Sequence, residues 1–472
     1  MMAPNMARQF FERHEAEHGA RRIFFIGIGG VHMSALAVYS KQRGYAVSGS
    51  EREETERVVR LRQAGIPVYI GHDGIHVKGA DIVVYTLAIP EDNPEYVAAR
   101  EAGVPLFSRA EYLGLLMGDF RRRIGVAGSH GKSTVTAMLG EIFWRAGRAP
   151  NVFCGAPVRA FGESYFFGGG EDLIFEACEY RRSFLFFSPT LAVVLNTGHD
   201  HVDTYPTAPA AREAFSSFAA LPEQRGTVLV NADDEGALSA GRKSPARCVT
   251  FGLGARADFR VEDVRYRMGR ASFIPVTPTG KWERISLRVA GRHNLYNALA
   301  ALAAARLSGL GEEEIAAGLT AFCGAGRRME YKGLLCGARV YDDYAHHPEE
   351  IAATLGAARE LLPVGGRLFV VFQSHTYSRT ASFLGEIAAA LRGADRVLIA
   401  DIYAAREKDT LGMSKEVLAA AVGERALAPQ GLAEITWILL SELSAGDVLV
   451  VMGAGDIDRI FGEFSPNHFT LP

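Results

Sequence analysis

A short apolar strand that runs into a glycine-bounded loop and then a helix constrains this chain more than any other stretch. Residues 124–127 are expected to form the strand, and Lys132 opens the helix. Such a loop lets backbone N–H groups surround a phosphate, and the helix N-terminus adds partial positive charge. Lys132 can reach the outer phosphates of a nucleotide, and the Ser133 hydroxyl can ligate Mg²⁺. The residues predicted to form this cradle are Gly128, Ser129, His130, Gly131, Lys132, Ser133 and Thr134.

The spacing of this loop differs from the common pattern G-x-x-x-x-G-K-[ST], because Val126 stands where the first glycine is expected. A shorter G-x-x-G-K-S-T remains. An ordinary glycine-rich turn between a strand and a helix is the alternative interpretation. The Gly-Lys-Ser-Thr order at a strand-to-helix junction favours the phosphate loop.

Composition and charge limit the class of protein. With 48% hydrophobic and 22% charged residues, the 472-residue chain is expected to be soluble and to form roughly three domains. The formal net charge of −3 gives no indication of a surface for nucleic acid or an anionic membrane. The five cysteines are odd in number and form no C-x-x-C, so we expect reduced thiols. Because the N-terminus lacks an apolar signal segment and no long apolar run occurs, we expect a cytoplasmic protein.

Three sections of the chain each begin with a strand, a glycine-rich or polar turn and a helix. Alternation of strands and helices predicts an α/β protein with parallel sheets. A more antiparallel insert is expected over about 246–289, followed by a helix over 294–307. The predicted domains are residues 1–119, 120–325 and 326–472. Expected strands elsewhere are 22–26, 46–49, 67–70, 81–85, 104–107, 172–177, 192–196, 227–231, 338–342, 367–372, 396–399 and 448–452.

The turn GIGGVHMS at 27–34 brings backbone amides to a helix N-terminus, which suits a diphosphate. The next strand ends at Ser50 and Glu51, where a dinucleotide fold places the acid that contacts a ribose. His32, however, stands where the fingerprint G-x-G-x-x-G has its third glycine. The pattern therefore leaves open NAD and another diphosphate ligand such as a UDP-sugar.

Two polar segments follow apolar strands of the second section. Glu176 ends one strand, and the segment 196–203, which contains His201, ends another. In a parallel sheet both ends open on the side of the phosphate loop, where a carboxylate and an imidazole could hold a divalent metal. The alternatives are a loop-capping carboxylate for Glu176 and a surface histidine for His201. Glu179 and Asp203 are weaker candidates.

Asn294 and Asn297 lie three residues apart at the start of an alanine-rich helix. Side chains at this spacing share a helix face, and two amides there could bind a purine or a ribose. Capping of the helix by Asn294 is the alternative, and both can hold.

Polar residues also open the third section. Arg328 could neutralise a transferring phosphoryl group, or be a surface arginine at a domain border. His346 and His347 suggest a metal site, but adjacent residues on an irregular loop diverge and no third ligand is evident. Arg379 follows an apolar strand and could bind a carboxylate, or be a solvated loop arginine.

Taken together, these blocks resemble the Mur ligases of peptidoglycan precursor synthesis. The likeness runs through IGIGGVHMS, GSHGKST, EACEYRRSF, DHVDTY, GRHNLYNALAA, RRMEYKG, DDYAHHPEEI and FQSHTYSRT, in order along nearly the whole chain. It implies three domains: an N-terminal, Rossmann-like domain for a UDP-linked substrate, a central ATPase domain with a parallel sheet, and a C-terminal Rossmann-like domain. No lysine occurs between Lys132 and Lys243, which agrees with the branch of the family that has no carbamylated lysine.

The resemblance also implies site roles. Lys132 would hold the β- and γ-phosphates of ATP, and Ser133, Glu176 and His201 would hold Mg²⁺. Further ATP contacts would come from His293, Asn294, Asn297, Arg328 and Asp343. Substrate contacts would come from Gly27, Gly29, Gly30, His32, Met33, Ser50, His72, Tyr344 and Arg379, and Tyr344, His346 and Arg379 would lie near the incoming amino acid.

The implied reaction joins L-alanine to the lactyl carboxylate of UDP-N-acetylmuramate through an acyl phosphate. Lys132 and Arg328 would stabilise the transferring phosphoryl group, and either His201 or His346 would deprotonate the amine. One block departs from the family: Asn196 to His199 lacks the usual acid, which bears on the local metal or base arrangement. A sister ligase that attaches a recycled tripeptide, and a more distant NAD-binding module, remain alternatives. We expect a monomer or homodimer with no nucleic-acid or membrane partner.

Overall fold

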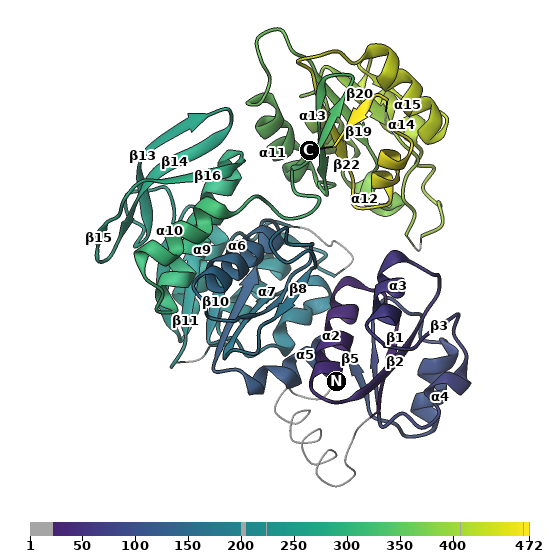
Figure 1. Cartoon of the computed structure of the whole chain (residues 1–472), viewed down its shortest axis with the longest axis vertical. Helices are drawn as coiled ribbons and strands as arrows, with labels where there is room; N and C mark the ends of the chain where they lie inside the picture. Colours follow the sequence, from purple (N-terminus) through teal and green to yellow (C-terminus); the bar gives the residue numbers. More distant parts are fainter. Residues whose placement is uncertain (1–21, 200–203, 223, 406, 466, 472) are drawn as a thin grey trace. The chain divides into compact units, whose positions relative to one another are not determined.

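The computed structural model describes residues 22–199, 204–222, 224–405, 407–465 and 467–471 (Figure 1). These residues form three sheets of mainly parallel strands with helices between the strands, and one small antiparallel sheet. The predicted α/β fold class, with parallel sheets and an antiparallel insert that follows the central sheet in the chain, is confirmed. Contacts divide the chain into two compact units: unit 1 is residues up to Arg260 with Leu299–Gly318, and unit 2 is Val261–Ala298 with the residues from Leu319 onward.

The N-terminal sheet is parallel throughout and has the strand order β3-β2-β1-β4-β5. Residues 23–26 of β1 are buried, as expected for a parallel strand covered on both faces. Strand order reverses between β1 and β4, so the turn after β1 lies at the switch point where such folds bind ligands. The elements are β1 (Arg22–Ile26), α2 (Val31–Gln42), β2 (Ala46–Glu51), α3 (Glu56–Gln63), β3 (Val68–Ile70), η1 (Gly74–Val77), β4 (Ile82–Tyr85), α4 (Pro94–Glu101), β5 (Leu106–Ser108), α5 (Arg109–Leu116) and η2 (Met117–Asp119).

The central sheet has the order β12-β11-β10-β6-β9-β7-β8, and only the edge strand β8 is antiparallel to its neighbour. β9 and β10 flank β6, so their carboxyl ends lie beside the loop that follows β6. The elements are β6 (Arg122–Ala127), α6 (Lys132–Arg145), β7 (Asn151–Phe153), β8 (Tyr165–Phe167), β9 (Asp172–Glu176), η3 (Tyr180–Phe186), β10 (Leu191–Val194), α7 (Ala208–Ala219), β11 (Thr227–Asn231), α8 (Glu235–Lys243) and β12 (Arg247–Phe251).

The predicted start of the antiparallel insert at about 246 is wrong. β12 pairs in parallel with β11 and belongs to the central sheet. As an edge strand it buries Val249 and Phe251 and exposes Arg247 and Cys248, a pattern that antiparallel strands also show. The insert itself comprises β13 (Arg260–Arg267), β14 (Arg270–Thr277), β15 (Gly280–Lys281) and β16 (Ile285–Ala290).

The C-terminal sheet has the order β21-β20-β19-β22-β18-β17-β23. Its central strands are parallel, whereas β17 and β23 are antiparallel additions at one edge that strand–helix alternation does not predict. Two helices precede this sheet in the chain, α9 (Arg292–Leu307) and α10 (Glu312–Ala321), and their residues Leu299–Gly318 belong to unit 1. The elements that follow are β17 (Glu330–Leu335), β18 (Ala338–Asp343), α11 (Pro348–Arg359), β19 (Leu368–Phe372), α12 (Tyr377–Ser382), α13 (Leu384–Leu391), β20 (Arg396–Ile399), α14 (Lys415–Val422), β21 (Ala426–Leu427), α15 (Gly431–Glu442), β22 (Val448–Met452), η4 (Ile457–Gly462) and β23 (Phe469–Thr470).

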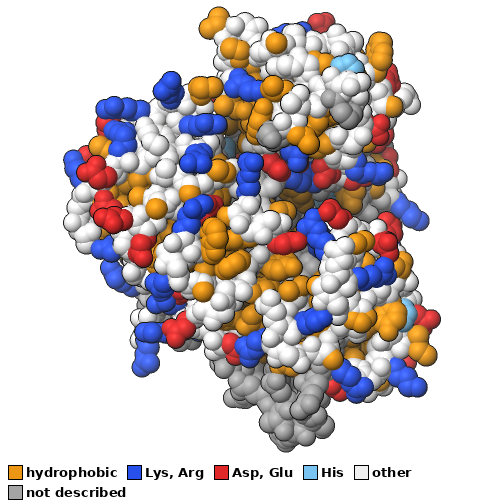
Figure 2. All heavy atoms as spheres, in the orientation of Figure 1, with side chains coloured by type: hydrophobic (Ala, Val, Ile, Leu, Met, Phe, Trp, Pro, Cys, Tyr) orange, Lys and Arg blue, Asp and Glu red, His pale blue; other side chains and the backbone are white. Residues whose placement is uncertain are grey.

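The surface carries both signs of charge. The face drawn in Figure 2 shows both lysine and arginine side chains and aspartate and glutamate side chains, and the formal net charge of the chain is −3. Among the described residues, no helix is both long enough and apolar enough to cross a membrane.

Gly114 fixes how closely α5 approaches η3 within unit 1. A Cβ atom added at Gly114 would overlap the carbonyl oxygen of Phe186. Because a backbone atom cannot move aside cheaply, Gly114→Ala is expected to lower the free energy of unfolding by about 1–3 kcal/mol. Gly356→Ala on α11 is the control, since a Cβ there meets nothing within 4 Å and alanine favours a helix. Denaturant unfolding of both variants tests this, and equal effects would contradict the packing.

Candidate active site

The loop after β6 has the backbone that a phosphate cradle needs. Gly131 is the N-cap of α6 and has φ +85°, a left-handed conformation that favours glycine. Gly128 has φ +154°, and a Cβ atom there would lie 3.0 Å from the Cβ of Leu195. Both glycines of the predicted loop are therefore required by conformation or space.

Asn196 holds the loop from the neighbouring strand end. Its side-chain oxygen accepts a hydrogen bond from the His130 amide at 2.9 Å, and its Nδ2 donates to the His130 carbonyl at 3.1 Å. The Ser129 hydroxyl donates to the carbonyl of Gly198 at 2.8 Å. The segment after β10 thus sets the shape of the loop. From the sequence, Asn196 is expected only as the end of a strand and the start of the polar segment 196–203, with no role in holding the loop. β10 in fact ends at Val194.

Lys132 lies across the loop that it follows. Its Nζ donates to the carbonyls of Gly128 and Ser129 at 2.5 and 3.1 Å, and it pairs with Glu179 at 3.0 Å. Burial lowers the pKa of Lys132, but Glu179, Cys178 and Glu176 outweigh it, so the net shift is upward and the ammonium stays charged. A fixed positive charge at the head of α6 suits the phosphates of a nucleotide.

Ser133 and Glu176 meet beside the loop. The Ser133 hydroxyl donates to Glu176 Oε2 at 2.8 Å, and the Gly155 amide donates to the same oxygen at 2.8 Å. A hydroxyl and a carboxylate are hard oxygen ligands of the kind that Mg²⁺ prefers. His201, the third predicted metal ligand, lies outside the described residues, as does Asp203.

Glu179 and His199 are tied to Tyr205. The hydroxyl of Tyr205 donates to the Glu179 carbonyl at 2.6 Å, and His199 Nε2 lies 2.7 Å from the Tyr205 carbonyl. His199, in the block that lacks the usual acid, therefore contacts the backbone of Tyr205.

The turn after β1 is fixed by β2. The amides of Gly27 and Ile28 both donate to the Ser50 carbonyl at 2.9 Å, and the Gly29 amide donates to Glu51 Oε2 at 2.8 Å. Gly30 is the N-cap of α2 and is exposed, whereas Met33 is buried. The acid that a dinucleotide fold would direct to a ribose is here directed to the turn.

Ser50 and His72 belong to a cluster around the buried carboxylate of Glu95. That carboxylate accepts from the Ser50 hydroxyl at 2.5 Å and lies 2.7 Å from His72 Nδ1 and 2.8 Å from His76 Nδ1. Tyr69 stacks on His76 with 4.3 Å between ring centroids. Glu95 and His76 were not predicted. Glu95 lies on α4, far along the chain, so sequence spacing gives no sign of it.

In unit 2, Asn294 and Asn297 lie together within the first turns of α9. Asn297 Nδ2 donates to Asn294 Oδ1 at 3.1 Å, and Asn294 Nδ2 donates to the Ala290 carbonyl at 2.7 Å. The shared helix face is confirmed, but capping by Asn294 is not seen because α9 begins at Arg292. Burial and then Arg328 lower the pKa of neighbouring His293 to about 4, so its imidazole is neutral at pH 7.

Asp343 is the last residue of β18, and Arg328 precedes β17. Asp343 accepts from the amides of Met329 and Ala345 at 2.6 and 2.9 Å and from the Thr354 hydroxyl at 3.1 Å, and burial raises its pKa. This carboxylate therefore shapes its loop. Arg328 lies over the Tyr344 ring, 5.3 Å from the centroid.

His346, His375 and Arg379 lie close together in the same unit. The rings of His346 and His375 are 5.6 Å apart, and Arg379 Nη1 is 3.3 Å from His375 Nδ1. Because a guanidinium only donates, that nitrogen of His375 accepts. Tyr403 stacks on His375 at 5.7 Å. His375 and Tyr403 were not predicted, although His375 lies in the same polar segment as Arg379.

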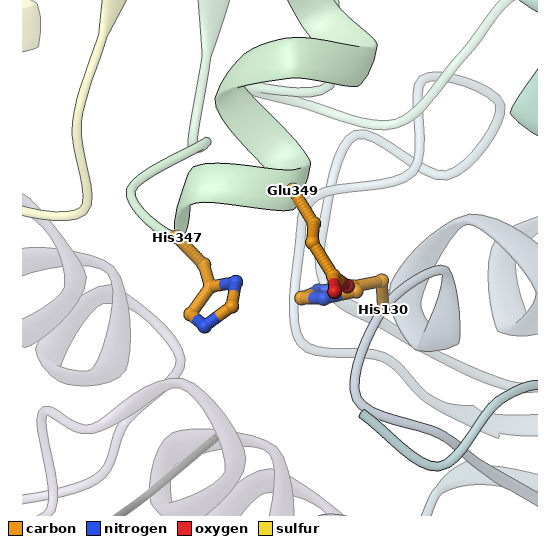
Figure 3. A group of neighbouring side chains, drawn as sticks. All are labelled: His130, His347 and Glu349. Atoms are coloured by element: carbon orange, nitrogen blue, oxygen red, sulfur yellow. The ribbon is translucent and has the colours of Figure 1, made fainter. Parts of the chain in front are cut away.

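Figure 3 labels His347 directly before α11, Glu349 on the first turn of α11, and His130 on the loop before α6. His347 is the N-cap of α11 and packs edge-on against Phe383 at 5.0 Å, whereas the ring of His346 packs against Tyr344. The two adjacent histidines thus point to different neighbours, as the irregular loop predicts.

Asp342 makes the stability of unit 2 depend on pH. Its carboxylate is buried, 3.5 Å from Arg327, and burial raises its pKa to about 7 from an ordinary value of 3.8. The folded state therefore binds this proton more tightly, so its contribution to stability is complete below about pH 4 and is lost as the pH rises towards 7. Asp342→Asn is expected to become progressively more stable than the parent over that range. Denaturant unfolding at several pH values measures this, and a constant difference would contradict it.

Models of three protein domains match the chain: "Mur ligase family, catalytic domain" over residues 22–121, "Mur ligase middle domain" over 126–305, and "Mur ligase, glutamate ligase domain" over 327–455.

Curated relatives and solved structures agree with these matches. The UDP-N-acetylmuramate–L-alanine ligase of Caldicellulosiruptor saccharolyticus is 39% identical over 442 residues, which is 93% of this chain and 97% of that protein. The enzyme of the same name from Clostridium novyi is 39% identical over 93% of this chain and 96% of its own. The crystal structure of UDP-N-acetylmuramate–alanine ligase from Thermotoga maritima has a TM-score of 0.80 and 29% identity, covering 94% of this chain and 98% of that chain.

Proposed function

The chain belongs to the Mur ligase family, and on that premise we propose that it joins L-alanine to the lactyl carboxylate of UDP-N-acetylmuramate at the expense of ATP. The observation that supports this proposal most is the phosphate cradle after β6. Lys132 and Ser133 open α6 there, and Glu176 accepts a hydrogen bond from the Ser133 hydroxyl. Relatives with this printed activity cover the chain almost end to end.

The proposed chemistry has two steps. The lactyl carboxylate attacks the γ-phosphorus of ATP, the bond to ADP breaks, and an acyl phosphate forms. The amine of L-alanine then attacks the acyl carbon, and the tetrahedral intermediate expels inorganic phosphate to leave the amide. The amine must first lose a proton, for which His346 and His201 are the candidates.

The chain's own groups supply charge and position. Lys132 is held charged at the head of α6 and would bind the outer phosphates, while Arg328 would offset charge on the phosphoryl group. Ser133 and Glu176, with His201, would hold Mg²⁺, which supplies charge neutralisation at the phosphates when bound. The paired amides of Asn294 and Asn297 offer donors and acceptors to a nucleotide.

The substrates are assigned to separate parts of the chain. We propose that residues 1–119 bind the UDP-linked sugar through Gly27, Gly29, Gly30, His32, Met33, Ser50 and His72. Residues 120–325 would bind ATP, and residues 326–472 would bind the amino acid near Tyr344, His346 and Arg379. We also propose that the protein acts in the cytoplasm as a monomer or homodimer.

Product identity tests this proposal. Purified protein is incubated with ATP, Mg²⁺ and UDP-N-acetylmuramate, together with L-alanine, glycine, L-serine or the murein tripeptide. We expect ADP release and a product heavier by one alanyl residue with L-alanine. A product only with the tripeptide would assign the chain to the sister ligase, and no ADP release with any acceptor would overturn the proposal.

A further inference from the structure

Arg109 is an arginine of unit 1 to which none of the roles above has been given. It is the first residue of α5, directly after β5. Ser108 caps this helix in a capping box, since its hydroxyl accepts from the Glu111 amide and the Glu111 carboxylate accepts from the Ser108 amide. This cap and the close contact of Gly114 with Phe186 fix the position of the Arg109 backbone.

Two polar atoms in this part of unit 1 are shielded from solvent. They are Nη1 of Arg109 and Nε2 of His32, and neither has a hydrogen-bond partner within the described ranges. A shielded polar atom without a partner costs free energy, because it has lost its water. Nη1 of Arg109 is a donor, and Nε2 of His32 is a donor in the tautomer that carries its proton there. The arrangement becomes favourable when a ligand supplies acceptor oxygens.

The surroundings of Arg109 indicate what kind of ligand fits. Burial lowers its pKa, while Cys178 and Glu176 act in the opposite direction, so the guanidinium lies within electrostatic reach of the carboxyl end of β9. His32 follows the turn after β1. Burial and then Arg109 lower its pKa, whereas Glu176 raises it, so His32 interacts electrostatically with both of these side chains. Arg109 is thus near enough to both His32, beside the turn that suits a diphosphate, and Glu176, beside the phosphate loop, to interact with them electrostatically.

We propose that Arg109, together with His32, binds the carboxylate of the UDP-linked substrate and positions it for attack on ATP. This inference rests on the proposed function. A guanidinium matches a carboxylate with two parallel hydrogen bonds. It also offsets the repulsion that the negative charge of Glu176 would exert on an approaching carboxylate.

Binding selectivity without ATP tests the proposal. UDP-N-acetylglucosamine shares the nucleotide and the sugar with UDP-N-acetylmuramate but lacks the lactyl carboxylate. Calorimetry gives the ratio of the two affinities for the parent, Arg109→Ala and Arg109→Lys. We expect the preference for UDP-N-acetylmuramate to fall about 10- to 100-fold in Arg109→Ala and less in Arg109→Lys, with little change for UDP-N-acetylglucosamine.

Arg43→Ala is the matched control. Arg43 caps α2 in the same unit, is exposed and pairs with Asp119 at 2.7 Å, so its loss is expected to leave the ratio unchanged. An unchanged ratio in both Arg109 variants, or equal weakening of both ligands, would overturn the inference. Product formation by the parent distinguishes failure of the proposed function from failure of this inference. If the parent forms no product, the proposed function is wrong. If the parent is active but the affinity ratio is unaffected in the Arg109 variants, only the role of Arg109 is wrong.

Discussion

Replacement of Lys132 by methionine is expected to lower kcat/KM for ATP by at least about 100-fold. Nζ of Lys132 is the charged group at the head of α6, and it is held there by two loop carbonyls and Glu179. Methionine keeps the length of the side chain but removes the charge that would stabilise the transferring phosphoryl group. Loss of one such electrostatic contact typically costs 100- to 1,000-fold in rate. Initial rates of ADP release across a range of ATP concentrations measure the effect.

The same substitution also removes the cation beside Glu179, so stability has to be separated from catalysis. Lys132→Met combined with Glu179→Gln removes both charges and is expected to unfold at a temperature closer to the parent while staying as inactive as the single variant. Lys243→Met is the control, since Lys243 is an exposed lysine near the end of α8. Rates near the parent's in folded Lys132→Met would show that this loop does not bind the reacting phosphates.

The elements that were predicted well are those whose signal is local. The phosphate loop, the turn after β1 and the buried parallel strands such as β19 each follow from a short apolar run and the glycine or polar residues after it. β17 forms a hairpin with the adjacent β18, but its sequence EYKGLL is not an apolar run. β23 has only two residues and pairs with the distant β17, so no local signal predicts it. The edge strand β12 was misassigned because its alternating burial is shared by parallel edges and antiparallel hairpins.

In the candidate site, the residues proposed to contact a ligand are easier to predict from the sequence than the residues that hold those side chains in place. Lys132 and Ser133 belong to a recognisable sequence motif. The roles of Glu95 and Arg109 depend instead on neighbouring residues that are distant in sequence. Glu95 lies 45 residues from Ser50, and its carboxylate accepts a hydrogen bond from the Ser50 hydroxyl. Such pairings depend on how helices lie against the sheet, and that is fixed by packing across the whole unit.

Glu176→Gln is expected to raise the Mg²⁺ concentration for half-maximal activity at least about 10-fold and to lower kcat by about 100-fold. The amide keeps the shape of the side chain and one oxygen that can accept from the Ser133 hydroxyl or the Gly155 amide. The fold of the loop is therefore expected to survive. The amide lacks the negative charge that a hard divalent cation requires of its ligands. Titration of Mg²⁺ at saturating ATP measures the shift.

Glu141→Gln provides the comparison for this charge change. Glu141 is also buried and lies on α6, but its carboxylate accepts from Arg145 at 2.9 Å on the same helix. Its loss is expected to affect stability more than the metal requirement. If Glu176→Gln lowered kcat with no shift in the Mg²⁺ requirement, the carboxylate would act by shaping the loop through Ser133 and Gly155. A shift in Glu176→Gln alone would place its charge at the metal, because a general effect of neutralising a buried carboxylate would appear in both variants.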